Sequence, residues 1–120
     1  MATTKTINIA GKQVNIAYCF GMDILFHGFT GMDFATYLTQ TAAQKTTTPK
    51  DILYAILAAA MAYAEMNETE APITDKDILF HASQQEITDA FKEVVALYME
   101  WHNLPAGEQS DKAEGNAGKN

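Results

Sequence analysis

Apolar and polar residues alternate along the first twenty positions of the chain, in the stretch KTINIAGKQVNIAYCF. Alternation is typical of a β-strand, because successive side chains of a strand point to opposite faces of the sheet. Gly11 interrupts the pattern where a tight turn can form. The stretch therefore predicts a β-hairpin over residues 6–20, with one face packed on helices. The expected strand positions are Ile7, Ile9, Val14, Ile16 and Tyr18.

From Gly21 onward the apolar residues recur every three or four positions, which is the period of an α-helix. Helix start signals support this change of period. Pro49 follows a threonine before one apolar run, and Ser83 and Glu86 have the spacing of a capping box. The predicted helices cover about residues 21–29, 32–39, 49–66, 75–82 and 84–103. A hairpin followed by four to five helices is an α+β fold, with the hairpin packed on a mostly helical domain.

The length of 120 residues suits one domain, and we expect it to cover residues 1–104. The remaining stretch, PAGEQSDKAEGNAGKN, contains no large apolar side chain. Such a segment cannot bury enough apolar surface to offset the entropy lost on ordering. We therefore expect residues 105–120 to form a disordered C-terminal tail.

Two of the predicted helices are candidates for binding another protein. The run ILYAILAAAMAYA has no polar face for about three and a half turns. Two interpretations are open: a central helix covered on all sides, or a helix with one side left for an apolar partner. The last predicted helix carries a stripe of large apolar residues at helical spacing. The candidate protein-binding residues on these helices are Ala55, Ala59, Ala62, Tyr63, Phe91, Tyr98 and Trp101.

The charge of the chain limits its partners. The net charge is −7, and all eight basic residues are lysines. Nucleic-acid-binding proteins need a cationic face and favour arginine for phosphate and guanine contacts, so we expect no nucleic-acid partner. Anionic lipid is disfavoured for the same reason, and the longest apolar run, residues 52–64, is too short to cross a bilayer. Without a secretory signal pattern at the N-terminus, the chain is expected to be soluble and intracellular.

The stretch AYCFGMDILFHGFTGMDF, residues 17–34, has the highest density of reactive side chains in the sequence. Cys19 is the sole cysteine, so no internal disulfide can form, and it stands eight positions from His27 without a second metal-ligand pair nearby. Its surroundings are typical of a buried cysteine. We interpret the stretch as the corner where a strand meets a helix.

Other candidate sites in the sequence are weaker still. His81 and His102 are isolated, and Asp23 with Asp33 is a poor candidate for a catalytic carboxylate pair. The acidic connector EMNETEAPITDKD lacks the alternating acids and central glycine of a calcium loop. We therefore expect no catalytic residue, no metal site and no cofactor.

The order of these features resembles that of the tail assembly chaperones of long-tailed bacteriophages and prophages. The resemblance covers about residues 6–101. It is carried by the glycine-turn hairpin INIAGKQVNIAY, the YCFG and FTG motifs, the proline-started helix TPKDILYAILAAAMAYA, and the segment ITDKDILFHASQQEITDAFKEVV. The chain departs from the family pattern in FHGFTG, where an uninterrupted helix with an acidic residue is expected, because Gly28 weakens a helix by about 1 kcal/mol relative to alanine.

The resemblance implies a non-enzymatic protein of the bacterial host cytoplasm that is absent from the mature virion. It implies two partners, the tape measure protein and the tail tube protein, and no catalytic residues. Many family members are also made in a longer, frameshifted form with a second domain. Self-association of the chain is open at this point.

Functions outside this family also fit the sequence. One is a phage structural adaptor, such as a connector or a tail completion protein, which would remain in the particle. Another is a small cytosolic regulatory protein that acts through helix pairing. An enzyme is the least favoured class, because the polar residues show no convergent pattern.

Overall fold

The N-terminal hairpin consists of β1, Thr3–Ile9, and β2, Lys12–Tyr18, paired antiparallel with Ile7 opposite Val14. Ala10 and Gly11 form the turn, and both have positive φ angles, of 55° and 73°. Positive φ at both central residues is the geometry that matches the twist of paired strands, and glycine adopts it without strain. The predicted hairpin is therefore confirmed.

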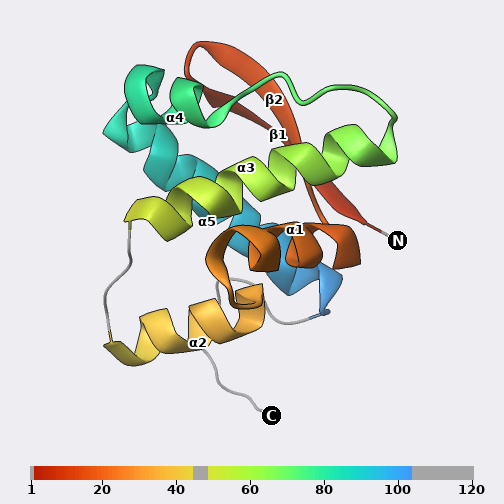
Figure 1. Ribbon diagram of the computed structural model, residues 1–120, viewed down its shortest axis with the longest axis vertical. Helices are drawn as coiled ribbons and strands as arrows, with labels where there is room; N and C mark the ends of the chain where they lie inside the picture. The colour runs from red at the N-terminus through yellow and green to blue at the C-terminus, as the bar shows by residue number, and fades with distance from the viewer. Residues whose placement is uncertain (1, 45–48, 104–120) are drawn as a thin grey trace.

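Five helices follow the hairpin in the computed structural model, which describes residues 2–44 and 49–103 (Figure 1). The α+β class predicted from the sequence is confirmed. The predicted tail at residues 105–120 lies outside the described residues. The helices are α1, Phe20–Thr30; α2, Phe34–Gln44; α3, Pro49–Met66; α4, Asp75–His81; and α5, Gln84–Trp101.

Local signals in the sequence explain where most helices begin and end. Thr74 and Ser83 each complete a capping box, at the starts of α4 and α5. Gly31 ends α1 in the left-handed conformation with φ of 84°, and its N–H donates to the carbonyl of His27. The α2 helix extends to Gln44, five residues past the predicted end at residue 39. The stretch TAAQ contains two alanines, and alanine has the highest helix propensity, so the helix continues through it.

The α3 helix is the central element of the fold. It contacts β2, α1, α4 and α5, while α5 packs against β1 (Figure 1). Nine residues of α3 are buried, which explains the absence of a polar face in its sequence. The helix is therefore central but not covered on all sides, because Ile52, Tyr54 and Met61 are only partly buried and Met66 is 48% exposed.

Aromatic side chains from four elements fill one end of the core. Tyr18 of β2 lies at the centre, with its ring 5.9 Å from that of Phe34 and 5.2 Å from that of Tyr98. Phe26 of α1 meets Phe34 edge-on at 5.2 Å. These contacts bring together the end of the hairpin, α1, α2 and the last turns of α5.

The hydrophobic surface of the helices gives no sign of a membrane-spanning segment. Within residues 2–44 and 49–103, no helix combines the length and the apolar character that crossing a bilayer requires.

Candidate protein-binding grooves

The three alanines of the predicted protein-binding set are buried. Ala55 and Ala59 have no exposed surface, and Ala62 is 3% exposed. The hairpin, α1 and α5 cover the side of α3 on which they lie, and the small methyl groups let these elements approach closely. Ala55 and Ala59 therefore pack inside the folded chain, whereas Ala62 also lines a groove between α1 and α3. Binding of a partner by residues of this set stays a prediction.

The four aromatic residues of the same set are half-buried, and three of them, Phe91, Tyr98 and Trp101, pack on the core. Tyr98 and Trp101 lie against Tyr18, and the ring of Phe91 is 6.2 Å from that of Tyr37. Tyr63 lines a shallow hollow beside β2, together with Gln13 and Asn15. These residues do not form one continuous exposed stripe.

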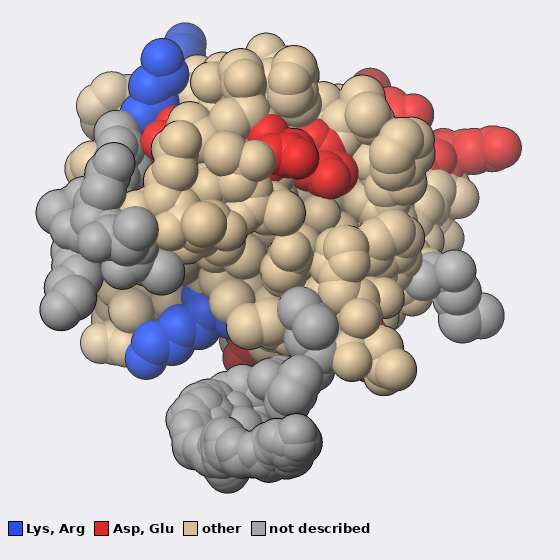
Figure 2. Space-filling view, turned by 90° about the horizontal axis from the view of Figure 1, so that it is seen from below, with Lys and Arg blue, Asp and Glu red and all other residues tan. Residues whose placement is uncertain are grey.

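A different set of large apolar residues reaches the surface. Figure 2 views the molecule from below Figure 1 and shows a mostly uncharged face with scattered acidic side chains, most of them in its upper half, and lysines on the left. The sequence did not single out the exposed large apolar residues, because they lie on helices that also contribute to the core. The exposed large apolar residues are Phe20 at 69%, Ile24 at 56%, Met66 at 48%, Leu79 at 56% and Phe80 at 75%.

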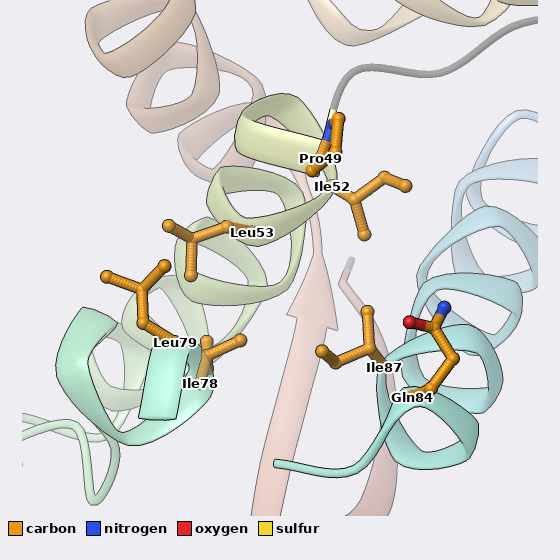
Figure 3. A pocket seen from close by; sticks show the side chains of 7 residues that line it. All are labelled: Pro49, Ile52, Leu53, Ile78, Leu79, Gln84 and Ile87. Atoms are coloured by element: carbon orange, nitrogen blue, oxygen red, sulfur yellow. The ribbon is translucent and has the colours of Figure 1, made fainter. Parts of the chain in front are cut away.

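One apolar groove lies where α3, α4 and α5 meet, and we call it the α4 groove (Figure 3). Its volume is about 300 Å³, and Gln84 supplies the polar side chain of its lining. Ile78 belongs to the core, whereas the neighbouring Leu79 is exposed, so the groove connects the core to the surface. The lining residues are Pro49, Ile52, Leu53, Ile78, Leu79, Gln84 and Ile87.

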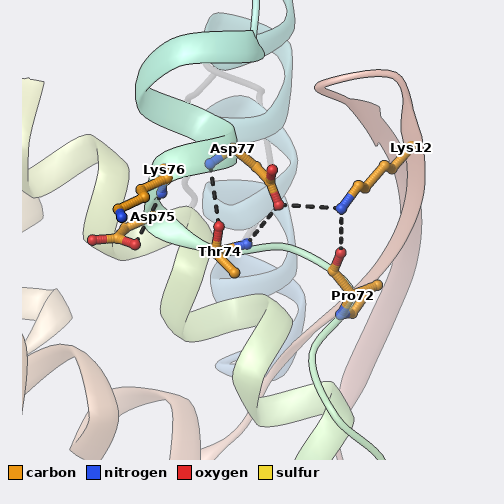
Figure 4. Close-up of polar contacts among 6 residues, drawn as sticks. All are labelled: Lys12, Pro72, Thr74, Asp75, Lys76 and Asp77. Carbon is orange, nitrogen blue, oxygen red and sulfur yellow. Dashed lines mark hydrogen bonds and ion pairs between the residues drawn. The ribbon is translucent and has the colours of Figure 1, made fainter.

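A polar cluster holds α4 in place beside this groove (Figure 4). The Lys12 ammonium group donates to the Pro72 carbonyl at 2.9 Å and to Asp77 Oδ2 at 3.2 Å. Asp77 Oδ2 also accepts from the Thr74 N–H at 3.0 Å. This bond and the Lys12 contact lower the pKa of the Asp77 carboxyl. The cluster ties the hairpin turn to α4 and so fixes the helix that carries Leu79.

A second apolar groove lies between the first turns of α1 and the last turns of α3, and we call it the α1 groove. Its volume is about 400 Å³. The exposed residues Ile24 and Met66 form its two sides, and Glu65 stands at its edge. The lining residues are Cys19, Gly21, Ile24, Leu25, Ala62, Glu65 and Met66.

The reactive residues of the corner at 17–34 do not converge. Cys19 precedes the first residue of α1, and His27 is exposed eight residues later, about 12 Å along the helix axis. Asp23 accepts a hydrogen bond from the Phe34 N–H at 2.9 Å and so links α1 to the start of α2. Among the described residues, no group of three or more His, Cys, Asp or Glu side chains could hold a metal ion. Cys19 is half-buried instead of buried, and it lies between the end of β2 and the start of α1, so the stretch forms a corner where a strand meets a helix.

The two most deeply buried tyrosines also have structural surroundings. Burial raises the pKa of the Tyr18 hydroxyl, and the negative charge of Asp23 raises it further, so this group stays protonated at neutral pH. Burial likewise raises the pKa of Tyr37, whose hydroxyl has no hydrogen-bond partner within the described part of the chain. Neither hydroxyl is placed to act as an acid or a base at neutral pH.

Comparisons of the chain with models of protein families, with curated proteins and with solved structures found no match. The resemblance to tail assembly chaperones therefore depends on the residues quoted for it. The two grooves are the features from which a function can be argued.

Proposed function

We propose that this protein is a non-enzymatic tail assembly chaperone of a long-tailed phage or prophage. In this proposal it binds the tape measure protein and tail tube subunits in the host cytoplasm and leaves before the virion is complete. The family part of the proposal comes from the order of the motifs, and the binding part from the exposed apolar surface.

The observation that carries the binding part is the pair Leu79 and Phe80. Both are more than half exposed on α4, whose first turn is linked to the hairpin by the Lys12–Asp77 ion pair. A folded chain gains little from displaying two large apolar side chains to water, and such patches are typical of interaction sites. The adjoining α4 groove offers an apolar floor for the side chains of a client helix.

The charge of the chain fits a protein that keeps apolar clients in solution. A net charge of −7 opposes aggregation of the free chaperone while the apolar surface remains accessible. A long helical client such as a tape measure protein would offer many apolar stripes of the kind that a groove accepts.

Co-expression tests the proposal directly. In this proposal the client is the tape measure protein of the same phage or prophage, and the measurement is the fraction of client found in the soluble part of the lysate. We expect wild type to raise that fraction several-fold and the double variant Leu79→Ser, Phe80→Ser to raise it much less. The matched control is Lys92→Ser, which changes an exposed residue of α5.

Two results would reject the proposal. One is a client that remains insoluble with the wild-type protein present. The other is recovery of this protein as a stoichiometric component of purified particles, which would instead favour a structural adaptor.

A further inference from the structure

We infer that the α1 groove binds an amphipathic helix that carries lysine or arginine along both sides of its apolar stripe. The inference rests on the proposed function, since it names the chemistry of a client segment and the place where that segment docks. It concerns a different surface from the Leu79 and Phe80 pair, so the two can be tested separately.

The groove has the shape and chemistry that a helix side chain needs. Its lining combines buried or half-buried apolar residues, Ala62 and Leu25, with the exposed side chains of Ile24 and Met66. Phe20 is 69% exposed one turn before Ile24, on the same side of α1. The volume of about 400 Å³ accommodates one or two large apolar side chains from a partner.

Two glycines on α1 have no role that the folded chain explains. Gly21 and Gly28 are both exposed and lie two helical turns apart, on either side of Ile24. A Cβ atom at Gly28 would meet nothing within 4 Å, and one at Gly21 would meet Cys19 Sγ at an ordinary contact distance of 3.7 Å. Neither glycine has a positive φ angle. Glycine destabilises a helix relative to alanine, and close approach of a second helix accounts for both positions.

The charges around the groove select a cationic partner. Glu65 lines the groove, and Glu68 is exposed just beyond the end of α3. The sequence contains no lysine or arginine in α1 or α2, nor in α3 after Lys50. Among the described residues that line the groove, Glu65 carries the charge, so basic side chains beside the apolar stripe of a partner helix would be attracted to it. A second copy of this chain would bring the same acidic residues to the groove, and the like charges would repel each other.

Peptide probes test this inference with the full chain. One probe is an 18-residue helical peptide with a leucine and alanine stripe flanked by lysines, and the matched probe carries glutamates at the same flanking positions. Cys19 lines the groove and is the sole cysteine of the chain, so its reaction rate with Ellman's reagent reports occupancy. We expect the lysine peptide at saturation to slow the reaction at least 5-fold, and the glutamate peptide to leave the rate unchanged. Equal protection by both peptides, or none by either, would overturn the inference.

Variants locate the binding site. Gly21→Leu places a side chain in the groove and is expected to lower the affinity for the lysine peptide at least 10-fold. Glu65→Lys should have a similar effect, and Asp89→Lys, which makes the same charge change beside β1, should have little. Peptide affinities are measured by fluorescence anisotropy, and circular dichroism verifies that each variant is folded.

Gly28→Ala separates binding from folding. Because the added methyl group meets open space, this change should raise the urea concentration at which the protein unfolds. It should also lower the affinity for the lysine peptide, because the methyl group keeps the partner helix at a distance. A stabilised variant that binds the peptide as tightly as wild type would contradict close helix approach.

The remaining outcomes distinguish this inference from the proposed function. If the wild-type chain self-associates and Gly21→Leu abolishes that association, the occupant of the groove is a second copy and the inference is wrong. If the lysine peptide does not bind but the client is still kept soluble, the groove inference fails and the chaperone proposal stands. If the peptide binds and the client is not kept soluble, the groove inference stands and the chaperone proposal fails.

Discussion

Glu86 joins two distant parts of the chain through one carboxylate oxygen. Its Oε1 accepts from the Ser83 N–H at 3.0 Å and from the Ala10 N–H at 3.1 Å. The first bond closes the capping box of α5, and the second holds the hairpin turn against the start of that helix. These bonds lower the pKa of the Glu86 carboxyl below its usual value of 4.5, because they favour its charged form.

This lowered pKa predicts a loss of stability in acid. A carboxyl whose pKa is lower in the folded state stabilises the fold above its unfolded pKa, and this stabilisation disappears as pH falls through the folded value. We expect the urea midpoint of the wild type to decrease between about pH 5 and pH 3, and that of Glu86→Gln to decrease less steeply. Glu100→Gln, on an exposed position of the same helix, is the control. Identical pH profiles for wild type and Glu86→Gln would contradict this role.

At the scale of elements, α3 depends on small residues that sit between several neighbours. Ala59 is fully buried where the hairpin and other helices surround the helix. No space or polar partner is provided there for a larger or charged side chain. The alanines of α3 therefore serve packing within the chain, and they are the reason why one helix can contact so many elements.

A charge at Ala59 should therefore act on folding. We expect Ala59→Glu to lower the free energy of unfolding by about 3–5 kcal/mol, because an unpaired charge would be buried. Urea denaturation followed by circular dichroism measures the change. Lys50→Glu is the control, since it places the same side chain on the exposed first turn of α3, where the helix dipole favours it. A stable, folded Ala59→Glu protein would show that the centre of α3 tolerates rearrangement.

At the scale of the whole molecule, stability and binding depend on different apolar residues. Ile78 and Leu79 are neighbours on α4, yet Ile78 is 2% exposed and Leu79 is 56% exposed. The first side chain packs in the core, and the second lines the α4 groove. Their separation by one position allows the two roles to be compared within a single helix.

Substitutions at Ile78 and Leu79 should have separate effects on stability and on client binding. We expect Ile78→Ala to lower the free energy of unfolding by about 2–4 kcal/mol, because it leaves a cavity in the core. Leu79→Ala should change it by no more than about 0.5 kcal/mol and should still weaken client binding. Chemical denaturation and the client solubility assay measure the two effects. A large stability loss in Leu79→Ala would mean that the groove is structural.

The sequence by itself determined the elements of this protein and much of their boundaries. Alternation of apolar residues, the glycine of the turn and the capping residues Thr74 and Ser83 depend on neighbours a few positions away, so they can be read before the fold is known. The apolar character of residues 52–64 predicted a helix for the same reason, but it left open whether that helix is covered on all sides. The extension of α2 to Gln44 was missed because most of its added residues are polar. The helix continues there because alanine favours a helix even between polar residues.

Only the tertiary structure decided which apolar side chains reach the surface. Ala59 and Phe80 both belong to apolar stretches of helical sequence, but the first is fully buried and the second is 75% exposed. Burial depends on which distant segments pack over a residue, and no local pattern encodes that. The same reason explains why the sequence favoured the alanines of α3 as a binding surface, whereas the exposed apolar residues lie around the α4 and α1 grooves.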